Sequence, residues 1–118
     1  MSNIRKDNYV RNAEVRRVID GDTIEVLVDS GFKYYTVERI QIAGIRTDDI
    51  VGESKTERGL KAKEYVEDKL PEGSEIIIQS HGVDGFGRWV CDVYYKSGKG
   101  QLNLGTTLLC SGLVDKLD

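Results

Sequence analysis

Extended, β-branched runs interrupted once by a helix-type pattern are the feature that most constrains the fold of this chain. Residues 13–28, AEVRRVIDGDTIEVLV, alternate in polarity over their second half and indicate one bent strand or two, with Asp20-Gly21 as a candidate turn. Residues 32–45, FKYYTVERIQIAGI, form a second extended run after the turn signal Asp29-Ser30-Gly31. We therefore expect these two runs to pair as a hairpin.

The helix-type pattern covers residues 55–70, KTERGLKAKEYVEDKL, and places Ala62, Tyr65, Val66 and Leu70 on one face. Pro71 and Gly73 end it. Two further strands are predicted at residues 75–80 and 88–95, with a glycine-rich turn between them, and a short closing helix at 103–112, capped by Asn103 and stopped by Gly112. About five strands, with one helix after the third and another at the end, predict a mainly β (α+β) chain forming a small closed or partly open barrel.

Length and composition fit one globular domain spanning residues 1–118. The chain is 39% hydrophobic and 31% charged, and no apolar run approaches the ~20 residues of a membrane span, so no membrane partner is expected. The N-terminus lacks the apolar stretch of a secretory signal, which leads us to expect a cytoplasmic protein, with a monomer as the default state. Cys91 and Cys110 lack metal-ligand spacing and are expected to be reduced, structural thiols. The net charge of −3 argues against strong nonspecific nucleic-acid binding.

Three short segments could carry chemistry: VIDGDTIEV (18–26), IAGIRTDD (42–49) and DGFGR (84–88). In this order, with the helical segment between the second and third and LNLGTTLLCSGL at the end, the chain resembles the staphylococcal nuclease (thermonuclease) family over about residues 13–114. The resemblance implies a five-stranded OB-fold barrel. It also implies a site that hydrolyses phosphodiesters of single-stranded nucleic acid with one Ca²⁺, which two aspartates and a backbone carbonyl bind through oxygen. In such a site a glutamate handles the attacking water and two arginines neutralise the phosphate.

Carried over residue by residue, the family pattern is kept at its two ends and altered in its middle. Asp22 stands at the first metal aspartate, and Arg88 at the second phosphate arginine with Asp84 before it at the family's spacing. The first arginine of the family is replaced by Gln41, the second metal aspartate by Arg46, the proline by Asp48 and the glutamate by the shorter Asp49. The positions matching catalytic residues are therefore Arg88, Asp49 and Gln41. Asp22, Thr47 and Asp48 are the candidate metal ligands only if a divalent ion binds.

Arg46 bears most directly on whether a cation can bind. A unit positive charge about 4 Å from Ca²⁺ is repelled by roughly 2 kcal/mol even in water, and losing the aspartate roughly doubles that penalty. We therefore expect no cofactor, with Ca²⁺ required only if the chain is an active enzyme. Asp22 and Arg46 are expected to form an ion pair where the metal would be, and Arg39 lies on the same strand face as Gln41, where its side chain could partly cover for the missing arginine.

Three functions remain open from the sequence. The first is a thermonuclease-like module that binds single-stranded nucleic acid or nucleotides weakly to moderately through Arg88, Arg39 and Arg46, with Ca²⁺-dependent hydrolysis lost. The second is an active phosphodiesterase with a rearranged site that uses Asp22, Asp48 and Asp49 for a divalent ion. The third is a protein-interaction domain on an inactive nuclease fold.

Overall fold

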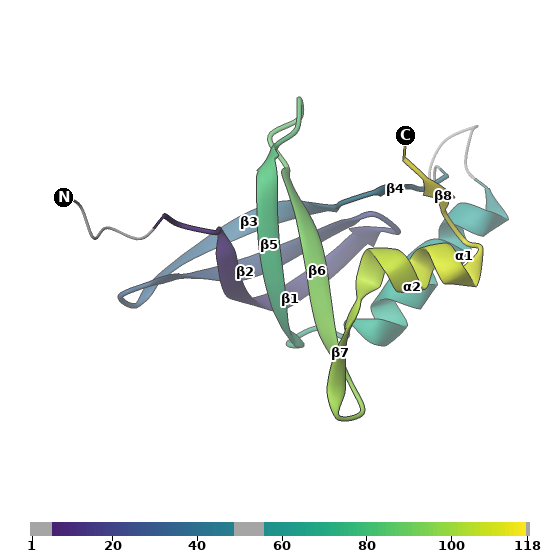
Figure 1. The fold of residues 1–118 in the computed structure, drawn as a ribbon. Coiled ribbons are helices and arrows are strands. Elements are labelled where there is room, and N and C mark those ends of the chain that lie inside the picture. The colour runs from purple at the N-terminus through teal and green to yellow at the C-terminus, as the bar shows by residue number, and fades with distance from the viewer. Residues whose placement is uncertain (1–5, 49–55, 118) are drawn as a thin grey trace.

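A closed five-stranded barrel with two helices forms the body of the molecule (Figure 1). The computed structural model describes residues 6–48 and 56–117. The barrel strands are β1 (Val10–Asp20), β2 (Thr23–Gly31), β3 (Tyr34–Ile42), β5 (Glu75–Val83) and β6 (Trp89–Ser97). The remaining elements are β4 (Ile45–Arg46), α1 (Glu57–Lys69), β7 (Gly100–Asn103), α2 (Leu104–Ser111) and β8 (Asp115–Lys116). The predicted mainly β class, with a five-stranded barrel and two helices, is confirmed.

Strand pairing closes the barrel in the order β1, β2, β3, β6, β5 and back to β1. The neighbouring barrel strands are antiparallel except for β3 and β6, which run parallel over Ile40–Ile42 and Trp89–Cys91. Such a five-stranded barrel, with α1 between β3 and β5, has an OB-like arrangement. β7 extends the sheet beyond β6, while β4 and β8 form a separate two-stranded ladder.

Alternation along the strands fills the barrel with apolar side chains. Val15, Ile24, Val26, Ile40 and Val93 are each no more than 1% exposed and belong to one core cluster. Intervening residues point outward, which is the period-two pattern that predicted these strands. The polar positions described below therefore lie on the outer face of the barrel.

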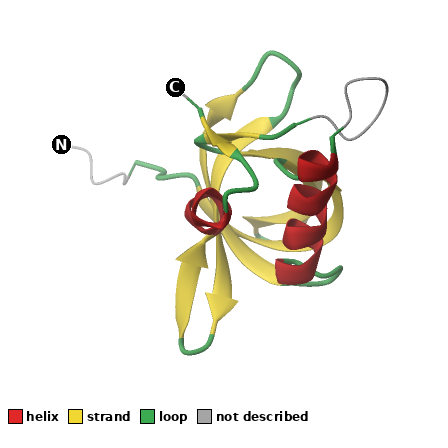
Figure 2. Ribbon diagram, turned by 90° about the vertical axis from the view of Figure 1, so that its right-hand side faces the viewer, coloured by secondary structure: helices red, strands yellow, loops and turns green. Residues whose placement is uncertain are grey.

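Both helices gather at one end of the molecule, while the tip of the β2–β3 hairpin extends at the opposite end (Figure 1). Figure 2 looks onto the end with the helices, where α2 is seen end-on and α1 lies beside it. The hydroxyl of Thr56 caps α1 by accepting the Gly59 N–H at 3.0 Å. The Asn103 side chain caps α2, and Gly112 ends that helix with φ of 77°, as the sequence predicts. Ala62 and Val66 of α1 are fully buried, so this helix covers the barrel with its predicted apolar face.

The order of the elements along the chain was predicted better than the residues at which individual strands begin and end. β5 continues past residue 80 to Val83, because Gly82 adopts φ of 128° at a register shift and carries the strand onward instead of turning it. β4, β7 and β8 are between two and four residues long, too short for a pattern to predict. The turn predicted at residues 97–100 is confirmed and joins β6 to β7.

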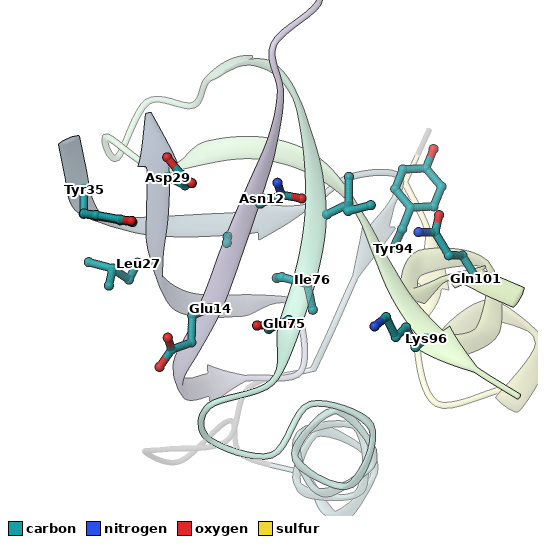
Figure 3. A pocket seen from close by; sticks show the side chains of 12 residues that line it. Asn12, Glu14, Leu27, Asp29, Tyr35, Glu75, Ile76, Tyr94, Lys96 and Gln101 are labelled. Carbon is teal, nitrogen blue, oxygen red and sulfur yellow. The ribbon is translucent and has the colours of Figure 1, made fainter. Parts of the chain in front are cut away.

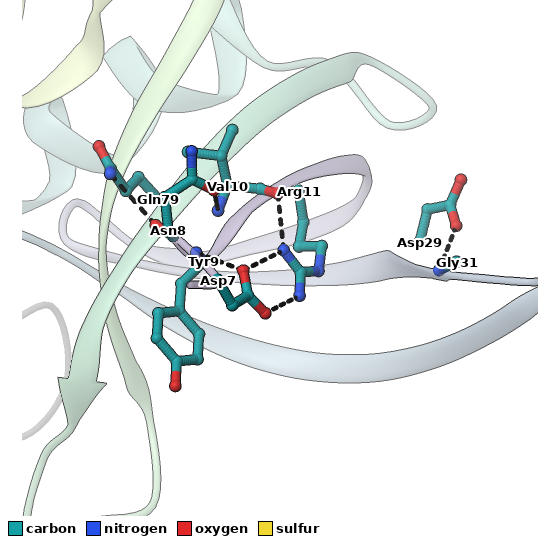
Figure 4. Close-up of polar contacts among 8 residues, drawn as sticks. All are labelled: Asp7, Asn8, Tyr9, Val10, Arg11, Asp29, Gly31 and Gln79. Carbon is teal, nitrogen blue, oxygen red and sulfur yellow. Dashed lines mark hydrogen bonds and ion pairs between the residues drawn. The ribbon is translucent and has the colours of Figure 1, made fainter. Parts of the chain in front are cut away.

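Polar contacts hold the N-terminal end of β1 against β5 (Figure 4). Asp7 and Arg11 form a two-pronged ion pair, with Nη1 to Oδ1 at 3.0 Å, and Asp7 also accepts the Tyr9 N–H at 2.7 Å. The Gln79 amide donates to the Asn8 carbonyl at 3.2 Å. These contacts order the segment that precedes the first strand.

No helix in the described ranges is long and apolar enough to cross a bilayer.

Candidate functional site

Residues from three separate segments of the chain meet at one edge of the barrel's outer face. They are Asp20 at the end of β1, Asp22 in the β1–β2 turn, Thr23 at the start of β2, Gln41 near the end of β3, and Asp84 and Arg88 at the two ends of the β5–β6 turn. Thr23 pairs with Gln41 across the β2–β3 ladder, and Gln41 pairs with Val90 across the parallel β3–β6 ladder. We call these six residues the Asp22–Arg88 cluster. Barrel closure is what brings them together.

Asp22 is the centre of the cluster, and both of its carboxylate oxygens already accept hydrogen bonds. Oδ1 accepts from the Thr23 hydroxyl at 2.9 Å, and Oδ2 accepts from the Gln41 side-chain amide at 3.0 Å. Burial alone would raise the pKa of Asp22, but hydrogen bonds from Asp20, Gln41 and Thr23 and the charge of Arg88 together hold it below its ordinary value. Asp22 is therefore a stable carboxylate with neutral donors on both oxygens.

Asp20 lies beside Asp22 and behaves in the opposite way. Its Oδ1 accepts the backbone N–H of Asp22 at 3.0 Å. Burial, together with the hydrogen bond and the negative charge of the Asp22 carboxyl, raises the pKa of Asp20 to about 6. One proton is thus retained by the pair well above the pH at which a free aspartate ionises.

Arg88 is fixed by contacts on two sides. Its Nε donates to Asp84 Oδ2 at 2.7 Å, and its Nη1 donates to the Thr23 hydroxyl at 3.0 Å. Asp84 also accepts the backbone N–H groups of Phe86 and Arg88, at 2.8 and 3.0 Å. Burial would raise the pKa of Asp84, but these backbone and side-chain hydrogen bonds lower it. The Phe86 ring lies 5.4 Å from the guanidinium carbon.

Gly21 lets the turn between Asp20 and Asp22 pack closely against α1. A Cβ at this position would lie 2.7 Å from the Cβ of Ala62 and 2.9 Å from the Cγ2 of Thr47. Thr47, a candidate metal position, therefore lies against the turn that carries Asp22. Only glycine leaves enough room for this approach.

Asp48 and Arg46, both expected from the sequence near Asp22, have their contacts at the start of α1 and at the β4–β8 ladder. Asp48 Oδ2 accepts from the Thr56 hydroxyl at 2.9 Å, and its Oδ1 is 3.8 Å from Arg58 Nη1, so its carboxylate is engaged at the start of α1. Arg46 is exposed on β4, opposite Asp115 of β8. The pKa of Asp115 is lowered by Arg58 and, to a smaller extent, by the charge of Arg46. Asp49 lies outside the described residues.

The predicted ion pair between Asp22 and Arg46 is wrong. Among the ion pairs of residues 6–48 and 56–117 there is none between these two, and Gln41 is the residue that contacts Asp22 Oδ2. The reason is strand alternation, because Ile45 is 1% exposed in the core and its neighbour Arg46 is turned outward toward β8. The amide of Gln41 thus takes the place that we assigned to a guanidinium.

Arg39 is exposed two residues before Gln41 and pairs with Glu25 across the β2–β3 ladder. Glu25 accepts from Arg17 Nε at 2.7 Å. The pKa of Glu25 is lowered, first by Arg17 and further by the charge of Arg39. Arg39 therefore lies on the face of the cluster next to a carboxylate, and its predicted contact with a phosphate stays a prediction.

The candidate metal ligands Asp22, Thr47 and Asp48 can be compared with what Ca²⁺ requires. Calcium needs six to eight oxygen ligands, usually with several carboxylates among them. Within the described ranges no group of three or more His, Cys, Asp or Glu side chains is placed to hold a metal ion. Asp48 is engaged at the start of α1, and Asp22 already accepts bonds on both oxygens. The carboxylates of Asp22 and Asp48 thus have different hydrogen-bond partners, and their role as metal ligands stays a prediction.

Two contacts of the cluster, those of Gln41 with Asp22 and of Arg88 with Thr23, were not predicted from the sequence. The sequence indicates Gln41 only as a replaced arginine, although its amide, one residue before the end of β3, can donate to the carboxylate in the β1–β2 turn. The contact between Thr23 and Arg88 joins residues far apart in the sequence, and no local pattern predicts it. The Asp84–Arg88 pair, in contrast, could be inferred from its four-residue spacing around a glycine turn.

No protein-family model matches the chain, and no curated protein matches it at a significant level. The OB-like fold and the geometry of the Asp22–Arg88 cluster are therefore the basis for any statement about function.

Proposed function

We propose that this chain is a thermonuclease-like domain that binds phosphodiester groups of single-stranded nucleic acid or nucleotides, with Ca²⁺-dependent hydrolysis lost. The observation that carries the proposal is the hydrogen bond between Arg88 and Thr23. It joins the two motifs, DGDT and DGFGR, on which the resemblance to the staphylococcal nuclease family rests. Two segments that carry the resemblance and lie far apart in the sequence thus meet at one site, which supports a common origin of this site and the site of that family.

Arg88 retains the donors that a phosphate needs. A guanidinium has five N–H donors, and the contacts to Asp84 and Thr23 use two of them. The remaining three N–H groups lie on the two terminal nitrogens, which form the fork that meets two phosphate oxygens at once. The Arg88 side chain is 27% exposed, so a ligand can reach it, and Asp84 holds it in place before the ligand arrives.

Gln41 explains why hydrolysis should be lost. A cation at Asp22 would have to compete with the Gln41 and Thr23 hydrogen bonds, and within the described ranges no group of three or more His, Cys, Asp or Glu side chains is placed to hold it. Replacing an arginine by a neutral amide also removes one of the two positive charges that stabilise the phosphoryl transition state in the family. The phosphate-contacting half of the site is therefore kept and the hydrolytic half is not.

A titration with a short single-stranded oligonucleotide, followed by amide chemical shifts, tests binding. We expect the shifts to centre on Thr23, Gln41 and Arg88. Arg88→Gln should weaken binding roughly tenfold or more, because charge-assisted hydrogen bonds contribute about 1.5–3 kcal/mol. Lys99→Gln, on the exposed β6–β7 turn, removes the same charge away from the site and should change binding little. Binding that Arg88→Gln leaves unchanged, or no shift at millimolar ligand, would contradict the proposal.

Hydrolysis is tested on the same protein with single-stranded DNA and added Ca²⁺. We expect no release of acid-soluble nucleotides. Release that stops on adding a chelator and on changing Asp22→Ala would show that the chain is an active phosphodiesterase, and would overturn the predicted loss of activity while leaving phosphate binding by Arg88 intact.

A further inference from the structure

A groove of about 440 Å³ crosses the outer face of the sheet (Figure 3). Leu27, Asp29 and Tyr35 line one side, Glu14 and Glu75 lie in the middle, and Tyr94 lies on the other side. Leu27 is four residues along β2 from Thr23, a distance of roughly 13 Å in an extended strand. The groove is therefore separate from the Asp22–Arg88 cluster.

Like charges face each other in the middle of this groove. Glu14 of β1 and Glu75 of β5 are direct cross-strand partners in the antiparallel ladder, and both are exposed. Directly opposite residues have Cβ atoms about 5 Å apart, and like charges in such a pair destabilise the sheet. Neither carboxylate belongs to an ion pair in the part of the chain that the structure describes. With Asp29 also present and Lys96 as the cation of the lining, the groove has an excess of negative charge.

Apolar and aromatic surface flanks the carboxylates. Tyr35 is 57% exposed, and Leu27 and Ile77 add aliphatic surface to the lining. A basic side chain on an aliphatic stem suits such a groove, because its stem packs on apolar atoms while its charged head meets carboxylates. A guanidinium suits it better than an ammonium, since it also stacks on tyrosine rings and bonds carboxylates with its fork. Phosphate groups, in contrast, would be repelled.

We propose that this groove binds a protein segment through an arginine side chain placed between Glu14 and Glu75, with apolar neighbours of that arginine on Leu27 and Tyr35. Charge complementarity favours this occupant, because the groove carries an excess of carboxylates. The bound arginine neutralises a pair of carboxylates that repel each other in the free protein. This interaction surface is additional to the proposed phosphate-binding cluster. It selects a positively charged ligand, whereas the cluster selects a negatively charged one.

The test uses a short peptide with a central arginine flanked by leucines, and the same peptide with uncharged citrulline in place of arginine. Titrations followed by amide shifts should give saturable changes at Glu14, Leu27 and Glu75 with the arginine peptide, and much weaker changes with the citrulline peptide. No saturable change at millimolar arginine peptide would overturn the proposal. Equal binding of the two peptides, or a single-stranded oligonucleotide that shifts the same groove amides, would overturn it as well.

Variants sharpen the test. Glu14→Gln and Glu75→Gln should each weaken binding of the arginine peptide by about two- to fivefold, as expected for an exposed ion pair, and the double variant by more. Each single variant should also raise the melting temperature, because it removes the cross-strand repulsion, so that weaker binding cannot be ascribed to a damaged fold. Glu67→Gln, on the exposed face of α1, is the matched control and should bind like the unaltered protein. Unchanged binding by the double variant would contradict the assignment.

Discussion

At the scale of single residues, the cluster contains two neighbouring aspartates with opposite behaviour. Asp22 is kept ionised by three hydrogen-bonding neighbours and by Arg88, whereas burial and the adjacent Asp22 carboxyl raise the pKa of Asp20 to about 6. An ionised Asp20 is therefore unfavourable in the folded state. This cost depends on pH in a direction that can be worked out.

We predict that Asp20→Asn stabilises the protein at neutral pH. The folded state holds the Asp20 proton up to about pH 6, whereas the unfolded chain releases it near its ordinary value of 3.8. The free energy of unfolding of the unaltered protein should therefore fall as pH rises from about 4 to 6. Asparagine cannot ionise and can still accept the Asp22 N–H through its side-chain oxygen. Because Asp20 is only partly buried, solvent screening makes the gain smaller than the full pKa difference implies: it should be near zero at pH 4 and about 1–2 kcal/mol above pH 7.

Urea denaturation at both pH values measures this difference. Asp68→Asn, on the exposed face of α1, is a charge-matched control that should show no comparable gain at neutral pH. A gain of equal size at pH 4 and pH 7.5 would show that the effect does not come from the proton on Asp20.

At the level of secondary-structure elements, two tight turns differ in how well their residues suit the backbone conformation. The β1–β2 turn contacts α1 through Gly21, and the β2–β3 hairpin turns through Phe32 and Lys33, which both have positive φ, 54° and 65°. Two-residue hairpin turns of type I′ need positive φ at both positions, where Asn-Gly is preferred. The β1–β2 turn has the glycine that its close packing requires. The β2–β3 turn has Phe32 and Lys33 where Asn and Gly would be preferred.

We predict that Gly21→Ala destabilises the protein by about 1–3 kcal/mol, because its methyl group would overlap Ala62 and Thr47. Amide shifts of Asp22 and Gln41 should change as well, since the turn must move. Gly100→Ala is the control, because a Cβ there meets no atom within 4 Å. Equal stability of the two variants in urea denaturation would contradict close packing of this turn on α1.

In the second turn, Phe32→Asn with Lys33→Gly should raise the free energy of unfolding by about 1 kcal/mol. Positive φ costs an ordinary residue about 1–2 kcal/mol, and the added glycine gives back up to about 1 kcal/mol through the freedom of the unfolded chain. Phe32 is 98% exposed, so its removal loses little packing. Phe32→Ala with Lys33→Ala keeps the cost of positive φ and should not stabilise. A stability gain in the alanine pair as large as in the Asn-Gly pair would contradict the explanation by φ.

Local patterns were sufficient to predict most of these elements. Asn103 and Gly112 identified both ends of α2, and the strand alternation of Ile24, Val26 and Val28 identified the core face of β2. Patterns were insufficient where the backbone conformation of a glycine determines whether a strand continues or ends. Gly82 has a positive φ and continues β5 at a position that we assigned to a turn. Single-sequence reasoning cannot distinguish a glycine that bends a strand from one that ends it.

At the scale of the whole molecule, barrel closure decides which residues form the site. The parallel pairing of Ile40–Ile42 with Trp89–Cys91 places Gln41 between the β1–β2 turn and the start of β6, so that its amide contacts Asp22. The sequence indicated Asp22, Arg88 and Asp84 through their motifs. It gave the wrong partner for Asp22, because the pairing of β4 with β8, which turns Arg46 toward Asp115, depends on a strand of only two residues.

The Asp22 carboxylate accepts the Gln41 amide, and we predict that it does not hold a cation. The decisive experiment is a calcium titration of the unaltered protein, followed by calorimetry and by the amide shifts of Asp22, Thr23 and Gln41. We predict no saturable heat and no saturable shift at millimolar Ca²⁺. Saturable binding centred on these three amides, and removed by Asp22→Asn, would contradict the account.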